Sequence, residues 1–218
     1  ELPVEFAETL LKFLPNFDKV FLSNSGTESI EAAYKLARWP TKKKFVIAFN
    51  PSFHGRTMAS LSLTFSKPVQ RARYEPFLPV KHALYPYCYR CPFRRGEHET
   101  KECVNDYLNI INKKIKECKN NVGAIFFEPV AGEPGYIVPP KEFVKGLREL
   151  CNKNNILLCA DEVQSGCFRT GPFLAIENFN VKADIVSLSK SIGGGIPLGA
   201  TVSTSKIMDW PSFLKPIL

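Results

Sequence analysis

Short apolar runs alternate along the chain with segments whose apolar residues recur at helical spacing. Helical spacing is clearest over residues 4–14, 28–38, 104–115 and 143–151. Continuous apolar runs with the length of buried strands lie at Lys19–Leu22, Phe45–Phe49, Gly123–Phe127, Ile156–Ala160 and Asp184–Leu188. Apolar strands separated by helices are typical of a mostly parallel central sheet with helices on both faces, so we expect a doubly wound α/β fold.

Polar residues of chemically active kinds follow these apolar runs in chain order. They are Asn24–Thr27, Phe53–Thr57, Glu128, Asp161 and Lys190. In an open parallel sheet the carboxyl ends of the strands share one edge, and ligands bind in the crevice along that edge. We therefore expect these segments to converge on one site.

The segment Ser25–Thr27 opens the helix expected at 28–38. A helix N-terminus offers unpaired N–H groups and a positive dipole end, and with two hydroxyls this arrangement suits a phosphate. A plain helix cap made by Ser25 or Thr27 explains the same residues. Taken alone the segment favours the cap, so the phosphate interpretation depends on the other segments.

Asp161 and Lys190 each follow a strand that the pattern predicts to be buried. An unpaired carboxylate is unfavourable there, so Asp161 needs a cationic partner, which a protonated pyridine nitrogen or a structural salt bridge supplies. Lys190 precedes the glycine-rich stretch Ser191–Gly199, where backbone can approach a ligand closely. Desolvation there lowers the pKa of an amine, as imine formation requires, whereas a surface lysine is the plain alternative.

Composition narrows the classes of partner. The 218 residues are 44% hydrophobic and 23% charged, as in one globular domain spanning residues 1–218. The net charge is +8, but the basic residues are dispersed and form no aromatic-basic motif, which disfavours nucleic acid and favours a small anionic ligand. The apolar runs are too short to span a membrane.

The cysteines and the first residues bear on compartment and completeness. Seven cysteines, an odd number, argue against a full disulfide framework, so we expect a reducing, cytoplasmic compartment. The chain begins Glu-Leu-Pro-Val-Glu, with neither Met nor a basic-apolar leader, which predicts a fragment. Cys88, Cys91 and Cys103 leave open a metal site, a disulfide or plain loop cysteines, and we expect plain cysteines and no metal.

A resemblance to a known family is carried by ordered motifs. They are Asn24-Ser25-Gly26-Thr27-Glu28, Phe53-His54-Gly55-Arg56-Thr57, Glu128-Pro129-Val130, Asp161-Glu162-Val163-Gln164-Ser165-Gly166 and Ser189-Lys190. Over roughly residues 3–205 the chain resembles the class III aminotransferases, in their 4-aminobutyrate and acetylornithine branch. The resemblance implies the large domain of the pyridoxal-5'-phosphate (PLP) dependent transferase fold, fold type I, with PLP as cofactor.

The resemblance also implies which residues surround PLP. The backbone around Gly26 and Thr27, with Ser25, would hold the phosphate. Phe53 would stack on the ring and Val163 would pack on its opposite face.

Further residues are assigned to the ring edge. Gln164 would contact the ring oxygen and Asp161 would pair with the ring nitrogen. Lys190 would form the Schiff base and carry the proton. His54 would be a structural contact close to the ring, and Glu128 is also assigned to the cofactor site.

For the substrates, the resemblance implies that Arg56 receives a distal carboxylate and that Glu133 is a gate, paired with a later arginine beyond Leu218. The implied homodimer moves an amino group from 4-aminobutyrate to 2-oxoglutarate, giving succinate semialdehyde and glutamate. An acetylornithine or ornithine donor, and a truncated PLP-binding core without full activity, remain alternatives. An aminomutase or racemase is disfavoured, because Arg56 and Glu133 together suit two substrate carboxylates.

Overall fold

The computed structural model describes residues 1–93 and 101–209. The helices are α1 (Leu2–Lys12), α2 (Gly26–Thr41), α3 (Met58–Leu63), α4 (Pro68–Arg71), α5 (Lys101–Glu117), α6 (Lys141–Asn154) and α7 (Ser205–Met208), with 3₁₀ turns η1 (Cys88–Arg90), η2 (Ala175–Phe179) and η3 (Lys190–Gly193). The strands are β1 (Lys19–Ser23), β2 (Phe45–Asn50), β3 (Val80–Leu84), β4 (Val122–Phe127), β5 (Leu157–Asp161), β6 (Ile185–Leu188) and β7 (Gly199–Ser203).

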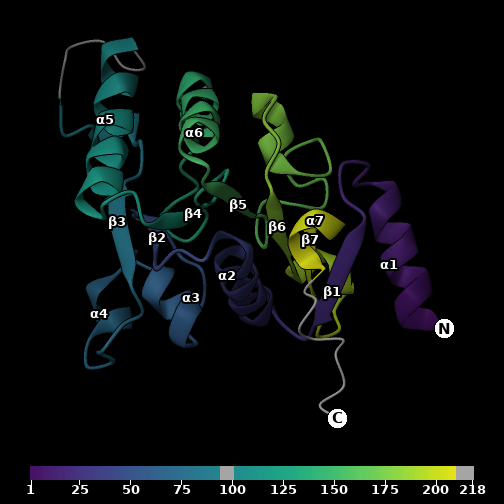
Figure 1. Ribbon diagram of the computed structural model, residues 1–218. Coiled ribbons are helices and arrows are strands. Elements are labelled where there is room, and N and C mark those ends of the chain that lie inside the picture. Colours follow the sequence, from purple (N-terminus) through teal and green to yellow (C-terminus); the bar gives the residue numbers. More distant parts are fainter. Residues whose placement is uncertain (94–100, 210–218) are drawn as a thin grey trace.

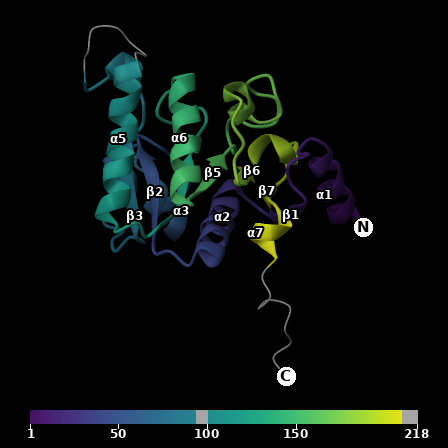
Figure 2. The ribbon, with the colours of Figure 1, turned by 45° about the horizontal axis from the view of Figure 1, so that its top comes forward.

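Within the described residues, the strands form one 7-stranded sheet in the order β1-β7-β6-β5-β4-β2-β3. The pairs from β3 to β6 are parallel, and β7 runs antiparallel to both of its neighbours. Helices α5 and α6 lie side by side over one face, and α2 and α3 lie over the other (Figure 1 and Figure 2). The expected α/β fold, mostly parallel and covered on both faces, is confirmed.

Strand β4 shows how the core forms on both sides of the sheet. All of its residues are buried, and successive side chains of a strand point to opposite faces. Phe126 therefore packs in the cluster that contains Tyr34 of α2, whereas Phe127 packs in the cluster that contains Phe143 of α6. Each buried aromatic side chain contributes about 1.5–3 kcal/mol of hydrophobic stabilisation. Glu128 follows Phe127 directly, so this buried strand places Glu128 at the carboxyl edge of the sheet.

The apolar pattern did not indicate β3, β7 or the short helices α3 and α4. β3 contains Lys81 and His82, as suits an edge strand, and β7 consists largely of small residues. Helix α5 begins at Lys101, before the helical spacing at residues 104–115 starts. Residues 94–100 lie outside the described residues. In the ranges 1–93 and 101–209, no helix combines the length and the apolar character that crossing a membrane requires.

The direction of β7 brings its first residue to the carboxyl edge of the parallel strands. Gly199 pairs with Ser23 at the end of β1, and Ala200 pairs with Leu188 at the end of β6. A Cβ atom on Gly199 would lie only 2.9 Å from the carbonyl carbon of Ser25. Glycine at this position therefore permits the start of α2 to approach the strand ends.

Candidate active site

The segments that follow β1, β2, β4, β5 and β6 meet at the carboxyl edge of the sheet. His54 contacts Asp161, and the backbone N–H of Phe53 donates to Glu128. A Cβ atom on Gly26 would lie 2.7 Å from Val163 Cγ1 and 3.3 Å from the Cβ of Ser189. The structure thus brings together segments that the sequence separates by more than a hundred residues.

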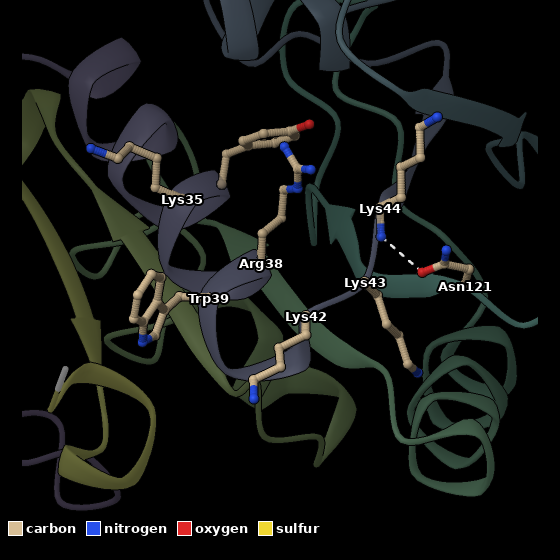
Figure 3. A pocket seen from close by; sticks show the side chains of 8 residues that line it. Lys35, Arg38, Trp39, Lys42, Lys43, Lys44 and Asn121 are labelled. Atoms are coloured by element: carbon tan, nitrogen blue, oxygen red, sulfur yellow. Dashed lines mark hydrogen bonds between the residues drawn. The ribbon is translucent and has the colours of Figure 1, made fainter. Parts of the chain in front are cut away.

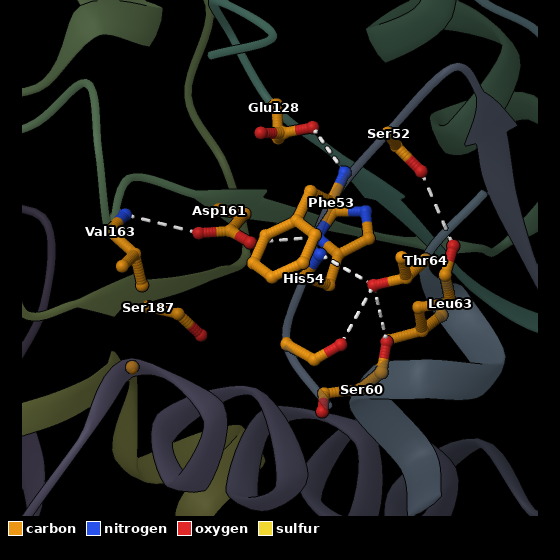
Figure 4. A network of polar contacts seen from close by, with 12 residues as sticks. Ser52, Phe53, His54, Ser60, Leu63, Thr64, Glu128, Asp161, Val163 and Ser187 are labelled. Atoms are coloured by element: carbon orange, nitrogen blue, oxygen red, sulfur yellow. Dashed lines mark hydrogen bonds and ion pairs between the residues drawn. The ribbon is translucent and has the colours of Figure 1, made fainter. Parts of the chain in front are cut away.

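Asp161 is buried and bonded through both carboxylate oxygens. Its Oδ2 lies 2.7 Å from Nδ1 of His54, and its Oδ1 accepts the backbone N–H of Val163 at 3.0 Å. Figure 4 shows this network together with Glu128, Thr64 and Ser60. The sequence predicted a ring nitrogen, an arginine or a lysine as the partner of Asp161, and the structure supplies His54.

His54 is held from two sides. Its backbone N–H donates to Thr64 Oγ1 at 2.8 Å, while its ring is fully buried against Asp161. Burial by itself lowers the pKa of His54, but the hydrogen bond and charge of Asp161, with the charge of Glu128, raise it above the ordinary value. The imidazole is therefore a buried hydrogen-bond partner that fixes the orientation of the Asp161 carboxylate.

Glu128 joins two loops at the end of β4. Its Oε2 accepts the N–H of Phe53 at 3.0 Å, and its Oε1 accepts the N–H of Gly132 at 3.4 Å. Burial raises the pKa of Glu128 to about 7, with His54 opposing and Asp161 reinforcing the shift. Glu128 therefore takes up a proton near neutral pH while it holds both loops in place.

The start of α2 combines a helix cap with a close approach to β5. The Oγ of Ser25 accepts the N–H of Glu28 at 3.3 Å, so the plain cap expected from the sequence is present. Thr27 Oγ1 bonds to Ser60 Oγ at 2.6 Å and to Thr57 Oγ1 at 2.9 Å, which ties α2 to α3. The N–H groups of Gly26 and Thr27, which precede the first intrahelical bonds, remain suited to an anion.

Lys190 stands at the turn after β6, with φ of 50°. Its Nζ lies 3.3 Å from Oε1 of Gln164, and Gln164 in turn packs against Gly132. The side chain is exposed, so the desolvation expected from the sequence is wrong for this chain. The reason is that strand burial ends at Leu188 and Ser189, and the 3₁₀ turn then leaves the sheet.

The two residues predicted to contact substrate differ in their surroundings. Arg56 is exposed in the loop between β2 and α3. Glu133 follows Gly132 and forms an ion pair with Lys67, whose Nζ lies 2.6 Å from Glu133 Oε1. Burial raises the pKa of Glu133, but the bonds and charge of Lys67 with Ser66 and Gln70 outweigh burial and lower it. The sequence pattern assigned no role at the site to Lys67.

Two further buried or bridging carboxylates were given no role from the sequence. Glu31 of α2 accepts the N–H groups of Ala59 and Ser60 at the start of α3, at 2.8 Å and 3.2 Å. Glu162 accepts the hydroxyl of Ser165 at 2.5 Å and the N–H of Ile176 at 2.9 Å, and burial raises its pKa to about 7. The signal for Glu162 in the sequence was its position: it is the second of two acidic residues that directly follow the apolar run Ile156–Ala160.

A cavity of about 540 Å³ opens at the opposite edge of the sheet, beside the end of α2 (Figure 3). It is lined by Tyr34, Lys35, Arg38, Trp39, Lys42, Lys43, Lys44 and Asn121. The side chains of Lys35, Lys42 and Lys44 point in different directions, and Lys43 donates to the carbonyl of Asn155 at 3.0 Å (Figure 3). These cations do not converge on one point, so the candidate site remains at the carboxyl edge.

The cysteines at 88, 91 and 103 belong to η1, to the residue after it and to α5. Cys91 and Cys103 have their sulfur atoms 3.3 Å apart, and Cys88 lies in the neighbouring turn η1. Burial raises the pKa of Cys103 to about 11. In the ranges 1–93 and 101–209, no group of three or more His, Cys, Asp or Glu side chains is arranged to hold a metal ion.

Curated relatives match almost the whole chain. Acetylornithine aminotransferase of Methanopyrus kandleri is 41% identical over 211 residues, which are 96% of this chain and 48% of that protein. Leucine/methionine racemase of Thermococcus litoralis is 36% identical, covering 95% of this chain and 47% of the relative. Probable 4-aminobutyrate aminotransferase of Bacillus subtilis is 35% identical, covering 94% and 48%. The chain spans about half the length of the curated relatives it matches.

Solved structures share the fold and identify the cofactor. Taurine:2-oxoglutarate aminotransferase of Bifidobacterium kashiwanohense, in complex with PLP and glutamate, matches with a TM-score of 0.88 and 30% identity over 98% of this chain and 49% of that one. A PLP-bound amine transaminase from an uncultivated Pseudomonas species matches with a TM-score of 0.88 and 29% identity over 94% and 48%. The fold is fold type I, and the cofactor is PLP. The aminotransferase class-III family model matches residues 1–214, and the chain belongs to that family.

Proposed function

We propose that this chain is the PLP-binding large domain, residues 1–218, of an aminotransferase that moves an amino group from an ω-amino donor to 2-oxoglutarate. The observation that carries the proposal is the buried Asp161–His54 pair, which lies at the same sheet edge as Lys190 and the start of α2. We propose 4-aminobutyrate as the donor, with succinate semialdehyde and glutamate as products. The Bacillus subtilis relative supports this choice, and the Methanopyrus kandleri relative keeps acetylornithine as the alternative.

The residues present fit the ring of PLP. A buried carboxylate at Asp161, kept in place by His54, suits a protonated pyridine nitrogen. When bound, PLP supplies an electron sink for the bonds around the amino-bearing carbon. Phe53, which follows β2, and Val163, which follows β5, are proposed to enclose the ring faces, with Gln164 at the ring oxygen.

The phosphate and the amine are assigned to the neighbouring segments. Ser25, Gly26 and Thr27 are proposed to hold the phosphate through the N–H groups at the start of α2, where Gly26 leaves room for close approach to Val163. Lys190 is proposed to attach PLP covalently and to remove and return the proton at the amino-bearing carbon of the substrate. Its exposure and its contact with Gln164 are consistent with a side chain that must change position.

The substrate side of the site is assigned to Arg56 and Glu133. Arg56 is proposed to receive the distal carboxylate of the donor through a bidentate contact. Glu133 is proposed to adjust the site between donor and 2-oxo acid. A homodimer and a cytoplasmic location stay predictions.

The test is turnover by the full-length protein loaded with PLP. We expect glutamate to form from 2-oxoglutarate with 4-aminobutyrate at a kcat/KM at least tenfold above that with acetylornithine or ornithine, about 1.4 kcal/mol in transition-state binding. A higher kcat/KM with acetylornithine than with 4-aminobutyrate would identify acetylornithine as the donor. The Thermococcus litoralis relative is named a racemase. If the protein inverts an amino acid in the absence of any 2-oxo acid, the reaction is racemisation and not amino transfer.

A further inference from the structure

One oxygen of Glu133 is surrounded by donors from a single short stretch, residues 66–70. Lys67 Nζ lies 2.6 Å from Glu133 Oε1, and Gln70 Nε2 donates to the same oxygen at 3.4 Å. The hydroxyl of Ser66 donates to Gln70 Oε1 at 2.6 Å, which orients the amide of Gln70 toward Glu133. The stretch that leads into α4 therefore holds the carboxylate from one side.

The other oxygen of Glu133 is left without a donor. Oε2 is buried, and it has no hydrogen-bond partner within the described parts of the chain. A buried acceptor without a donor is unfavourable, so this oxygen gains most from a cationic or N–H group that enters the crevice. Oε1 of Glu133 is therefore bound by Lys67 and Gln70, whereas Oε2 is available to a ligand.

Glu133 belongs to the margin of the candidate site. The preceding Gly132 donates its N–H to Glu128 and packs against the side chain of Gln164. Gln164 in turn accepts from Lys190 at 3.3 Å. A change in the charge at Glu133 therefore acts on ligands that approach Lys190.

We propose that Lys67 is a positioning residue that sets the charge Glu133 presents, and thereby the preference between 2-oxo acids with one and with two carboxylates. This inference rests on the proposed function. With Lys67 bound, the pair is neutral overall and a second substrate carboxylate meets little repulsion. Without Lys67, the oxygen of Glu133 presents an uncompensated negative charge to that carboxylate.

Exposure makes Lys67 suited to this role and to its test. The Lys67 side chain is 61% exposed, whereas that of Glu133 is 24% exposed. Removal of the Lys67 charge therefore leaves the fold intact and changes mainly the field at Glu133. The matched control is Lys113→Met, because Lys113 is an exposed lysine of α5 on a different part of the molecule.

The experiment compares 2-oxoglutarate with pyruvate as acceptors for the full-length PLP-loaded protein, with the same amino donor. We expect Lys67→Met to lower the ratio of the two kcat/KM values, 2-oxoglutarate over pyruvate, by about tenfold. Lys67→Arg keeps the charge and restores the ratio to within about twofold, and Lys113→Met leaves it unchanged. In a Glu133→Gln background, Lys67→Met has no further effect, because Lys67 acts through Glu133.

An unchanged ratio in Lys67→Met, or an equal loss in the Glu133→Gln background, would overturn the inference. Binding of the unreactive acids glutarate and butyrate, measured by calorimetry, separates this outcome from failure of the proposed function. If neither 2-oxo acid is aminated but Lys67→Met weakens glutarate alone by about tenfold, Lys67 acts as proposed on a different reaction. Equal changes for glutarate and butyrate overturn it whatever the reaction is.

Discussion

The polar network around Asp161 and the turn that carries Lys190 lie at the same edge of the sheet and are built in opposite ways. Asp161 and His54 are almost fully buried and bonded to each other. Asp161 also accepts the backbone N–H of Val163, and the backbone N–H of His54 donates to the hydroxyl of Thr64. Lys190 is exposed, and the glycines at 194 and 195 after it have open space beside them. In the proposed function, the carboxylate that keeps one orientation is fixed by burial, whereas the amine that changes position is exposed.

The difference predicts that substitutions in the two regions have different effects on activity and on stability. In the network, each side chain also holds the loops together, so a change there affects both. At the turn, a side chain with few contacts carries little folding free energy, so a change there affects activity alone. Substitutions at Lys190, Asp161, Arg56 and Glu128 test this separation, with expected effects that decrease in that order.

Lys190→Ala is expected to have the largest effect on activity and almost none on stability. Turnover should fall to background because the proposed attachment point and proton carrier is lost, while the thermal midpoint stays within about 2 °C, since the side chain is exposed. Steady-state assays and thermal unfolding of the full-length protein measure the two effects.

Chemical labelling provides an independent check on Lys190. Borohydride reduction of the PLP-loaded protein, followed by peptide mapping, should place the pyridoxyl group on the peptide Ser187–Gly193. The exposed lysines at 42, 44 and 113 serve as internal controls. Label chiefly on one of them would contradict the whole site assignment.

Asp161→Asn is expected to lower activity by several orders of magnitude and also to lower stability. Asparagine keeps the shape but loses the charge that faces His54 and, in the proposed site, the ring nitrogen. The free energy of unfolding should fall by about 1–3 kcal/mol, because a buried charged hydrogen bond is weakened. Single-turnover kinetics and urea unfolding measure both, and near-normal kinetics would show that another group holds the nitrogen.

Arg56→Ala is expected to lower kcat/KM for carboxylate-bearing substrates without affecting stability or PLP affinity. Loss of a charge-assisted bidentate contact costs about 2–3 kcal/mol, roughly 30- to 150-fold in kcat/KM. Arg90→Ala, at an exposed arginine of η1, is the matched control. Unchanged kcat/KM for both donor and acceptor would remove Arg56 from the site.

The convergence of the site segments was predictable because each one follows an apolar run that reads as a buried strand. Their pairing was not predictable, since His54 and Asp161 are 107 residues apart and only the parallel order of β2, β4 and β5 brings them together. Lys67 was missed for the same reason, because its partner Glu133 lies on a loop after β4.

Burial beyond a strand end was the least predictable property. The apolar run at residues 185–188 correctly indicated a buried strand. We expected Lys190 to be buried as well, only because it follows this strand by two residues. The chain leaves the sheet after Ser189, and the left-handed conformation of Lys190 turns its side chain to solvent. Strand β7 was missed because its small residues give no apolar run, although it supplies the glycine that admits the start of α2.

Glu128→Gln is expected to change the pH dependence of stability while leaving most of the contacts in place. Because burial raises the pKa of Glu128 from 4.5 to about 7, the folded state binds more protons than the unfolded state between these values. The free energy of unfolding therefore falls as pH rises from 4.5 to 7, by on the order of 2–3 kcal/mol from this group. Glutamine does not titrate, so urea unfolding at several pH values should show that part of the decline removed, while the decline from Glu162 remains.

Glu149→Gln, at an exposed position of α6, should leave the full decline. An identical pH profile for Glu128→Gln and the unsubstituted protein would contradict the raised pKa of Glu128 and mean that its carboxylate is ionised in the fold throughout this pH range.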